Sequence, residues 1–198
     1  MAIQINGNGT ITGINVGGLP DGIVDTDMIA ANAVATAKIA DSAVTSAKAS
    51  GLGGLTMAQE WSFAGYPLNY QNTTDLTSWN ARAGNVGSAM THSSGVFTFP
   101  STGIYQVHSS QTSLRISHES RYVTIFTYLS TDGGSNFTMQ KENYSNINND
   151  ASSIQTFNNQ VLIDITDTST HKVKFAVASE QTVSLSTTFV QFLKLGDT

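Results

Sequence analysis

The amino-acid sequence predicts a mainly β protein in which short strands alternate with turns and pack as an antiparallel sandwich or jelly roll. Charged residues make up only 12% of the chain, against roughly 25% in an ordinary soluble domain. Ser, Thr and Asn together supply 63 of the 198 residues. Apolar-patterned runs are separated by turn clusters about every 8–12 residues, which is typical of such folds. Because charged helix formers are scarce, long solvated helices are not expected.

Composition excludes several classes of protein. A hydrophobic fraction of 39% with 2 Trp, 6 Tyr and 9 Phe is enough to bury a core. The net charge of −5, without a Lys/Arg cluster, argues against nucleic acid and anionic membranes as partners. No apolar run is long enough for membrane insertion, and the first residues lack the pattern of a signal peptide. Cysteine is absent, which excludes disulfides, zinc–thiolate sites and cysteine nucleophiles.

Aromatic residues divide the chain into an aromatic-free part and a head. Residues 1–56 contain no Phe, Tyr or Trp, and every aromatic side chain lies between Trp61 and Phe192. A segment without aromatic residues cannot build an ordinary core alone. We therefore expect a docking segment over 1–21, a repeat stalk with a glycine hinge over 22–56, and one head domain over 57–198.

The aromatic-free part shows two patterns. Residues 3–16 alternate apolar and polar side chains around Asn6-Gly7-Asn8-Gly9, which predicts a small hairpin or two short strands. Residues 22–51 align without gaps as three ten-residue units, GIVDTDMIAA, NAVATAKIAD and SAVTSAKASG. Each unit predicts a bend, a β-branched residue, a Thr or Ser cap and one short helical turn.

The repeat units are too thin to be stable alone. Their few apolar side chains, including Val34, Ile39 and Val44, are candidates for burial between identical chains, because such repeats become stable by stacking. The alternative is a flexible Ala/Ser/Gly linker. The register kept over three units favours the ordered stalk.

The head domain is expected to contain seven strands. They are Gly95–Phe99, Gly103–Arg115, Tyr122–Thr131, Asn136–Glu142, Ile154–Ile165, His171–Ala178 and Thr187–Leu195. The connecting segments are rich in Gly, Pro, Asn and Asp, which favour turns.

One spacing in the head resembles that of the complement globular head, which shares its jelly roll with tumour necrosis factor. The matching positions are Trp79, Asn85, Met90, Phe97, Gly103, Tyr105 and Val107. The chain departs from the family pattern at Trp79 and Val107, where the family has Phe. It also departs at Met90, where the family prefers an aromatic residue or Leu, and at Ser109, where the family has an aromatic residue. Phe189-Val190-Gln191-Phe192-Leu193 is similar to the family's last strand, with Gln191 replacing a glycine.

The resemblance implies a TNF-like fold and a compact homotrimer with aromatic residues buried between subunits. Tyr105, Phe189 and Phe192 are the candidates for that role. The alternative for each is a place in the core of one subunit.

The stalk resembles fibre proteins of tailed bacteriophages. The resemblance rests on the ten-residue Ala-Val-Thr-x-Ala-Lys-Ile type of repeat and on the preceding phrase Val16-Gly17-Gly18-Leu19-Pro20-Asp21-Gly22. It implies three chains wound together, and threefold symmetry would then suit both stalk and head.

No catalytic or metal-binding pattern is present in the sequence. His92, His108, His118 and His171 lack the spacing of a metal site. Asp164 and Asp167 permit calcium binding, but turn formation explains them better. With four glutamates, the sequence does not point to a glycosidase. We therefore expect no enzymatic activity, no cofactor and no metal.

Aromatic residues near predicted loops are candidates for binding a sugar or a protein. They are Tyr66, Tyr70, Phe137 and Tyr144. The alternative for each is packing in the core or at an interface.

These observations favour a homotrimeric bacteriophage virion fibre on the virion surface, assembled in the host cytoplasm. Residues 1–21 would dock to a capsid, neck or tail protein, and the head would bind a host glycan or protein with avidity. The alternatives are a purely structural decoration protein, a glycan-degrading fibre and a cytokine-like secreted ligand.

Overall fold

The computed structural model describes residues 55–66, 68–116, 118–150 and 152–197, together with 34–35, 39–40, 43–44 and the backbone of 4–5 and 11–12. The chain divides into two compact units, Met1–Leu52 and Gly53–Thr198. All regular elements in the described part are strands.

In the first unit, β1 (Gln4–Ile5) pairs antiparallel with β2 (Ile11–Thr12), within the segment where the sequence predicts a hairpin or two short strands. The side chains of Val34, Ile39 and Val44 are exposed in the single chain. The helical turns expected in the repeats lie outside the described residues.

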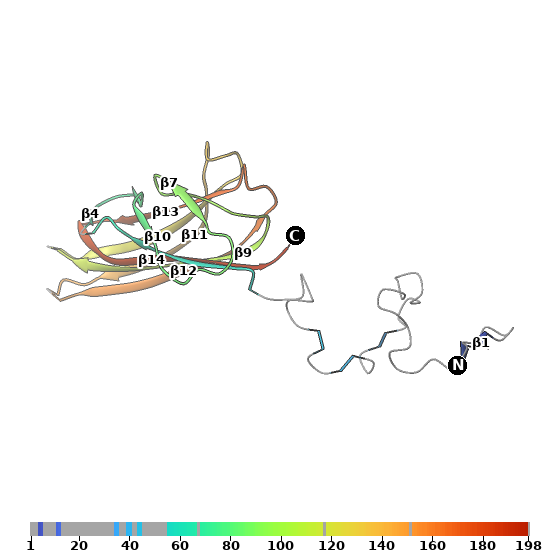
Figure 1. Cartoon of the computed structure of the whole chain (residues 1–198). Helices are drawn as coiled ribbons and strands as arrows, with labels where there is room; N and C mark the ends of the chain where they lie inside the picture. The colour runs from blue at the N-terminus through green and yellow to red at the C-terminus, as the bar shows by residue number, and fades with distance from the viewer. Residues whose placement is uncertain are drawn as a thin grey trace. The chain divides into compact units, whose positions relative to one another are not determined.

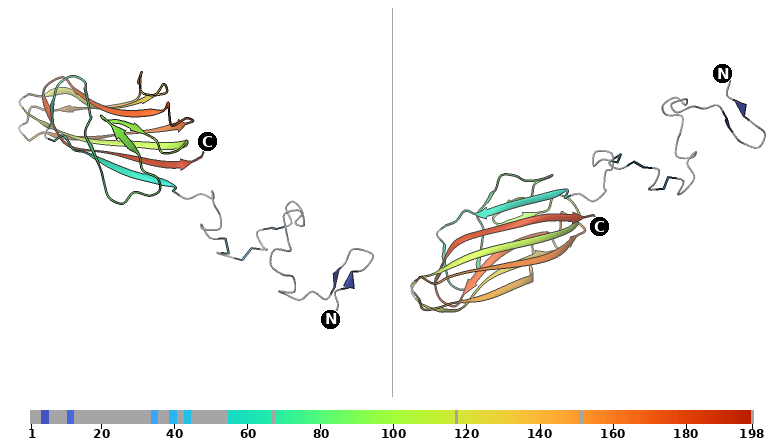
Figure 2. Two further views of the ribbon diagram at one scale, coloured as in Figure 1. Left: turned by 45° about the horizontal axis from the view of Figure 1, so that its top comes forward. Right: turned by 90° about the horizontal axis from the view of Figure 1, so that it is seen from below.

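The second unit is an all-β sandwich of two antiparallel six-stranded sheets (Figure 1). The first, named the β9 sheet, has the order β12-β9-β14-β3-β6, with β4 also pairing with β14. In Figure 2, β12, β9, β14 and β3 lie side by side as one layer. Their bounds are β3 Met57–Phe63, β4 Leu68–Tyr70, β6 Trp79–Ala81, β9 Gly103–Arg115, β12 Ile154–Ile165 and β14 Val183–Gly196.

The second sheet, named the β10 sheet, has the order β11-β10-β13-β8-β7, with β5 also pairing with β13. Its strands are β5 Thr74–Asp75, β7 Thr91–Ser93, β8 Val96–Thr98, β10 Ser120–Ser130, β11 Thr138–Ile147 and β13 Lys172–Ser179. The connections place neighbours in the sheet far apart in sequence, as in a jelly roll.

Aromatic side chains fill the space between the sheets. The rings of Trp79, Phe97, Phe175 and Phe192 contact one another edge-on or tilted, with centroids 5.1–6.2 Å apart. Trp61 adds an edge contact to Phe97 at 5.5 Å. Such geometry is what ring quadrupoles favour, so the aromatic residues that the first unit lacks are the centre of the head's core.

Two turns depend on positive φ angles. β7 and β8 are joined by Ser94 and Gly95, both with positive φ, as a two-residue hairpin of the primed type requires. Gly103 begins β9 with φ of 139°, and a Cβ there would lie 2.5 Å from the carbonyl oxygen of Gly196. Only glycine fits this corner.

The strand predictions were good where alternation is regular and failed where it is not. β9 and β12 have the predicted bounds, and the other five predicted strands overlap β8, β10, β11, β13 and β14. The five strands between residues 57 and 93 were not predicted from the sequence. In β3 the inward positions include Gln59, whose side-chain oxygen accepts a hydrogen bond from the backbone nitrogen of Met90 at 2.7 Å. A buried glutamine breaks the apolar alternation that identifies a strand.

Candidate subunit interface

The outer face of the β9 sheet carries more apolar surface than a solvent face needs. Along β9, Tyr105 and Val107 point to the core, so Ile104, Gln106 and His108 point outward. Leu162 on β12 is 62% exposed, and Ile104 and Leu195 are also exposed. Ile104 and Leu162 are diagonal neighbours across β9 and β12, with Asp164 and Gln106 opposite them. Exposed apolar side chains grouped in this way make the face a candidate interaction site.

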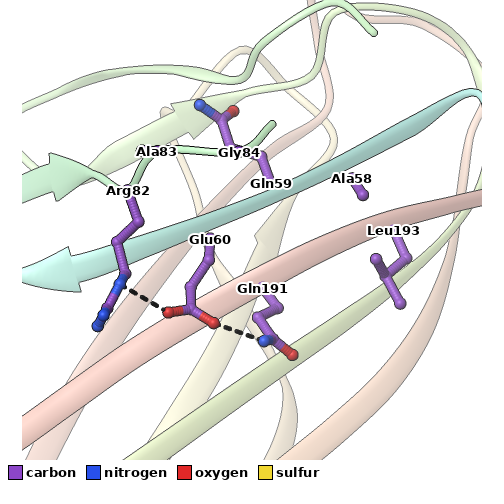
Figure 3. A pocket seen from close by; sticks show the side chains of 8 residues that line it. All are labelled: Ala58, Gln59, Glu60, Arg82, Ala83, Gly84, Gln191 and Leu193. Carbon is purple, nitrogen blue, oxygen red and sulfur yellow. Dashed lines mark hydrogen bonds and ion pairs between the residues drawn. The ribbon is translucent and has the colours of Figure 1, made fainter. Parts of the chain in front are cut away.

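A row of polar side chains crosses this face beside the apolar residues. The register places His108, Gln191 and Glu60 next to one another on β9, β14 and β3. Gln191 Nε2 donates to Glu60 Oε2 at 2.6 Å, and His108 Nδ1 lies 3.3 Å from Gln191 Oε1. Arg82 Nε contacts Glu60 Oε1 at 3.0 Å. Figure 3 shows Glu60 held between Arg82 and Gln191.

The polar row is satisfied within one chain. Glu60 has a cationic partner on one oxygen and an amide donor on the other, so no charge in the row is left without compensation. An exposed ion pair of this type contributes at most about 1 kcal/mol to stability. The polar row can therefore be buried under another subunit without leaving an unpaired charge. The exposed leucine and isoleucine side chains of this face favour such burial.

A shallow pocket of about 470 Å³ lies at one end of the row. It is lined by Ala58, Gln59, Glu60, Arg82, Ala83, Gly84, Gln191 and Leu193 (Figure 3). Glu60 is the single carboxylate among these residues, whereas glycoside hydrolysis commonly needs two.

Two of the three aromatic candidates take the alternative that the sequence left open, a place in the core of one subunit. Tyr105 and Phe192 are completely buried inside one chain, because both occupy inward positions of their strands. The ring of Phe99 lies 4.8 Å from that of Tyr105, and the Tyr105 hydroxyl bonds Ser101. Phe189, of opposite parity to Phe192, is half-buried on the outer face with its ring 5.7 Å from His108.

Tyr70 is also corrected as a surface candidate. It is 3% exposed, and its hydroxyl lies 2.9 Å from Ser113 Oγ and 2.6 Å from Gln111 Nε2, which donates to it. Burial raises the pKa of Tyr70 and the two hydrogen bonds partly oppose this shift, so the resulting pKa is about 12. A buried tyrosine needs such partners, so Tyr70 belongs to the core.

The remaining surface candidates lie in two different places. Tyr66 is half-buried, packs edge-on against Phe63 and donates to the carbonyl of Thr188. Tyr144 is exposed on β11, and Phe137 is half-buried in the loop between β10 and β11. The structure therefore brings Tyr144 and Phe137 to the β10 sheet and leaves Tyr66 apart from them.

The other candidate residues have local structural roles. His92 packs against Trp61 and Phe97, and His171 contacts the carbonyl of Asp167. Asp167 accepts from the backbone nitrogen and hydroxyl of Ser169, which lowers its pKa. Asp164 is exposed on β12. His118 lies in the segment between β9 and β10.

The described residues hold neither a candidate metal cluster nor a candidate membrane span. No group of three or more His, Asp or Glu side chains is placed to hold a metal ion. Likewise, the part of the chain that the structure describes contains no helix long and apolar enough to cross a membrane.

Parity along the strands could have located the outer face from the sequence. In the predicted strand 103–115, Ile104 has the opposite parity to Tyr105 and therefore faces outward. In the predicted strand 154–165, Leu162 has the opposite parity to Ile163 and faces outward in the same way. Glu60 and Arg82 could not be located in this way, since the strands around them went unrecognised.

Comparison with known proteins identifies the fold of the head. No protein-family model and no curated protein sequence matches the chain. The structure of Eiger TNF from S. frugiperda matches with a TM-score of 0.55 and 11% identity, covering 73% of this chain and 96% of that chain. The structure of murine APRIL matches with a TM-score of 0.50 and 14% identity, covering 70% of this chain and 98% of that chain.

The globular domain of zebrafish complement 1qA also matches, with a TM-score of 0.50, 11% identity and coverage of 72% and 99%. At these identities the likeness concerns the fold alone. The head domain thus has the jelly-roll fold of tumour necrosis factor and the complement globular head, as its sequence spacing indicated.

Proposed function

We propose that the chain is a homotrimeric fibre on a bacteriophage virion, with its head domain exposed to contact the host surface. The observation that carries the trimer is the outer face of the β9 sheet. Ile104, Leu162 and Leu195 are exposed there beside the hydrogen-bonded row, and a second copy of the chain would bury them. The trimer implied by the sequence resemblance gives this face a partner.

The stalk supports the same assembly. Val34, Ile39 and Val44 recur along the ten-residue repeats and are exposed in the single chain. Burying β-branched side chains between three chains would remove their apolar surface from water, at about 25 cal/mol per Å². The repeats and the phrase before them carry the bacteriophage assignment, with residues 1–21 as the segment that docks to a capsid, neck or tail protein.

The trimer is tested by light scattering coupled to size-exclusion chromatography. We expect the molar mass of the eluting full chain, measured by light scattering, to be three times the 21.0 kDa mass of one chain. Leu162→Asp should shift the population toward monomer, because the new carboxylate would be buried against a neighbouring subunit. The matched control is Met139→Asp, which changes an exposed side chain on β11 of the other sheet and should leave the trimer intact.

A monomeric wild-type chain would refute the assembly. Dissociation by both variants, or by neither, would show that the β9 sheet is not the interface. Host attachment is tested separately, by the binding of fluorescently labelled trimer to cells of the host. Absence of binding would leave a structural protein without a receptor.

A further inference from the structure

The outer face of the β10 sheet carries a second cluster of aromatic side chains, separate from the core. Tyr122, Phe126 and Tyr128 share one parity of β10, whose opposite parity includes the buried Val123 and Ile125. β11 adds Tyr144, and the loop before it adds Phe137. We name these five residues the aromatic strip.

Small side chains below the strip determine how its rings lie. The register places Thr124 beside Tyr144 and Ala178, and Phe126 beside Glu142 and Ala176. Tyr122 and Tyr128 pack against Phe126 and the two alanines, which are buried beneath them. The rings of Tyr122 and Tyr144 contact each other, and so do those of Phe126 and Tyr128. Phe126 is buried, and Tyr144, at 54% exposed, is the most exposed ring of the strip.

Polar groups are fixed along the edges of this surface. Lys174 Nζ donates to Asp75 Oδ2 at 2.7 Å and lies 4.9 Å from the ring centroid of Phe137 and 5.6 Å from that of Tyr128. The Tyr144 hydroxyl donates to Glu142 Oε2 at 2.5 Å. These contacts fix the carboxylates of Asp75 and Glu142 beside the rings of the strip.

The charges on this face are largely compensated within it. Lys174 pairs with Asp75, and Arg121, at the Tyr122 end, pairs with Glu180 at 2.8 Å. Glu142 adds a carboxylate, and Lys172, whose Nζ donates to Thr98 Oγ1 and to the carbonyl of Thr168, adds a cation. These charges balance, so the face favours neither an anionic nor a cationic ligand. Next to Arg121 lies a shallow pocket of about 220 Å³, which is also lined by the amides of Asn146 and Asn148.

We propose that the aromatic strip binds a neutral oligosaccharide. The apolar faces of sugar rings suit stacking on Tyr144 and Tyr122, whose rings contact edge-on at 6.1 Å. Sugar hydroxyls would donate to Glu142 and Asp75 and exchange hydrogen bonds with the amides of the adjoining pocket. A site combining ring faces with a few fixed polar groups has the general character of a ligand site.

This proposal rests on the proposed host attachment and specifies its surface. The strip lies on the sheet opposite to the candidate subunit interface, so trimer formation through the β9 sheet would leave three copies of it free. Three weak sites on one trimer give avidity without a tight single site.

The test measures binding of the labelled full chain to host cells after two treatments. Periodate, which cleaves vicinal diols of sugars, should abolish binding, whereas protease treatment of the cells should leave it. A neutral polysaccharide fraction from the same cells should compete. Tyr144→Ala should weaken binding at least tenfold, while Tyr144→Phe, which keeps the ring, should retain most of it. Val86→Ala, which shortens an exposed side chain outside the strip, should bind like wild type.

Each result separates the proposals. Loss of binding after protease but not after periodate would indicate a protein receptor and overturn the sugar assignment. Competition by an acidic fraction alone would also overturn it. Binding of Tyr144→Ala equal to wild type would place the site elsewhere while host attachment stands. No binding by wild type, with a trimer confirmed by light scattering, would overturn attachment and with it this site.

Discussion

At the scale of single residues, the corner at Gly103 shows why one position admits one amino acid. β9 starts there with positive φ, and the space where a Cβ would stand is occupied by the side chain of Lys194 and the backbone oxygen of Gly196. Lys194 is buried and donates to Asp197 Oδ1 at 2.6 Å, so it cannot swing away freely. Both the backbone conformation and the space therefore require glycine.

We expect Gly103→Ala to destabilise the head by about 2 kcal/mol or more, because the strained φ and the steric conflict add. Two matched variants separate these causes in urea unfolding. Gly84→Ala has positive φ but open space around the new methyl group, and should cost about 1 kcal/mol. Gly196→Ala has neither problem and should be close to neutral. Equal losses at Gly103 and Gly84 would contradict a role for close packing.

At the scale of elements, β9 changes character along its length. Its inward positions are aromatic or aliphatic at Tyr105 and Val107, but polar at Ser109, Gln111 and Ser113, all of them buried. Gln111 Nε2 donates to both Ser113 Oγ and the Tyr70 hydroxyl at 2.6 Å. The first part of β9 thus packs against aromatic rings, and its second part carries a hydrogen-bonded polar cluster in which Ser109 Oγ and Gln111 Oε1 have no partner within the described residues.

We expect Tyr70→Phe to lower the free energy of unfolding at pH 7 by about 1–2 kcal/mol, because Gln111 and Ser113 lose a buried partner. The free energy of unfolding of this variant should also fall less steeply as the pH rises above 10. The pKa of Tyr70 is raised from 10.0 to about 12, so its contribution is complete below pH 10 and lost as pH rises toward 12.

The measurement is urea unfolding at several pH values from 7 to 12. The slope of stability against pH should be reduced but not abolished in Tyr70→Phe, since the pKa values of Tyr66, Tyr128 and Tyr144 are raised as well. An unchanged alkaline slope would show that Tyr70 is not protected from ionisation by burial.

At the scale of the whole molecule, the two outer faces of the head differ in chemistry. The β9 sheet presents aliphatic side chains around a self-satisfied polar row, which suits a subunit contact. The β10 sheet presents aromatic rings edged by carboxylates, which suits a sugar ligand. Both faces and the aromatic core belong to Gly53–Thr198.

We therefore expect a fragment of residues 53–198 to fold and assemble without the repeats. It should show a β-type circular dichroism spectrum, unfold cooperatively and have the same number of subunits as the full chain by light scattering. A folded but monomeric fragment, beside a trimeric full chain, would assign assembly to the stalk. An unfolded fragment would contradict an independent core in the head.

The sequence by itself was sufficient to identify the long strands, the jelly roll and the division of aromatic residues along the chain. These features depend on local alternation and on spacing, as the coincidence of predicted and observed bounds for β9 and β12 illustrates. It was not sufficient for residues 57–93, where β3 carries the buried Gln59 on its inward face and the other four strands have only two or three residues each. β7 pairs with the adjacent β8, whereas β3, β4 and β5 are strands because they pair with β14 or β13, which lie far away in sequence.

The tertiary structure alone decided what each candidate side chain contacts. Tyr70 and Tyr144 were equal candidates in the sequence, yet one is sealed in the core by Gln111 and the other is exposed beside Glu142. Tyr105 and Phe192 joined the core, while Phe189 remained on the outer face. A side chain is buried when other strands pack over it. Which strands do so depends on pairing between strands that are distant in sequence.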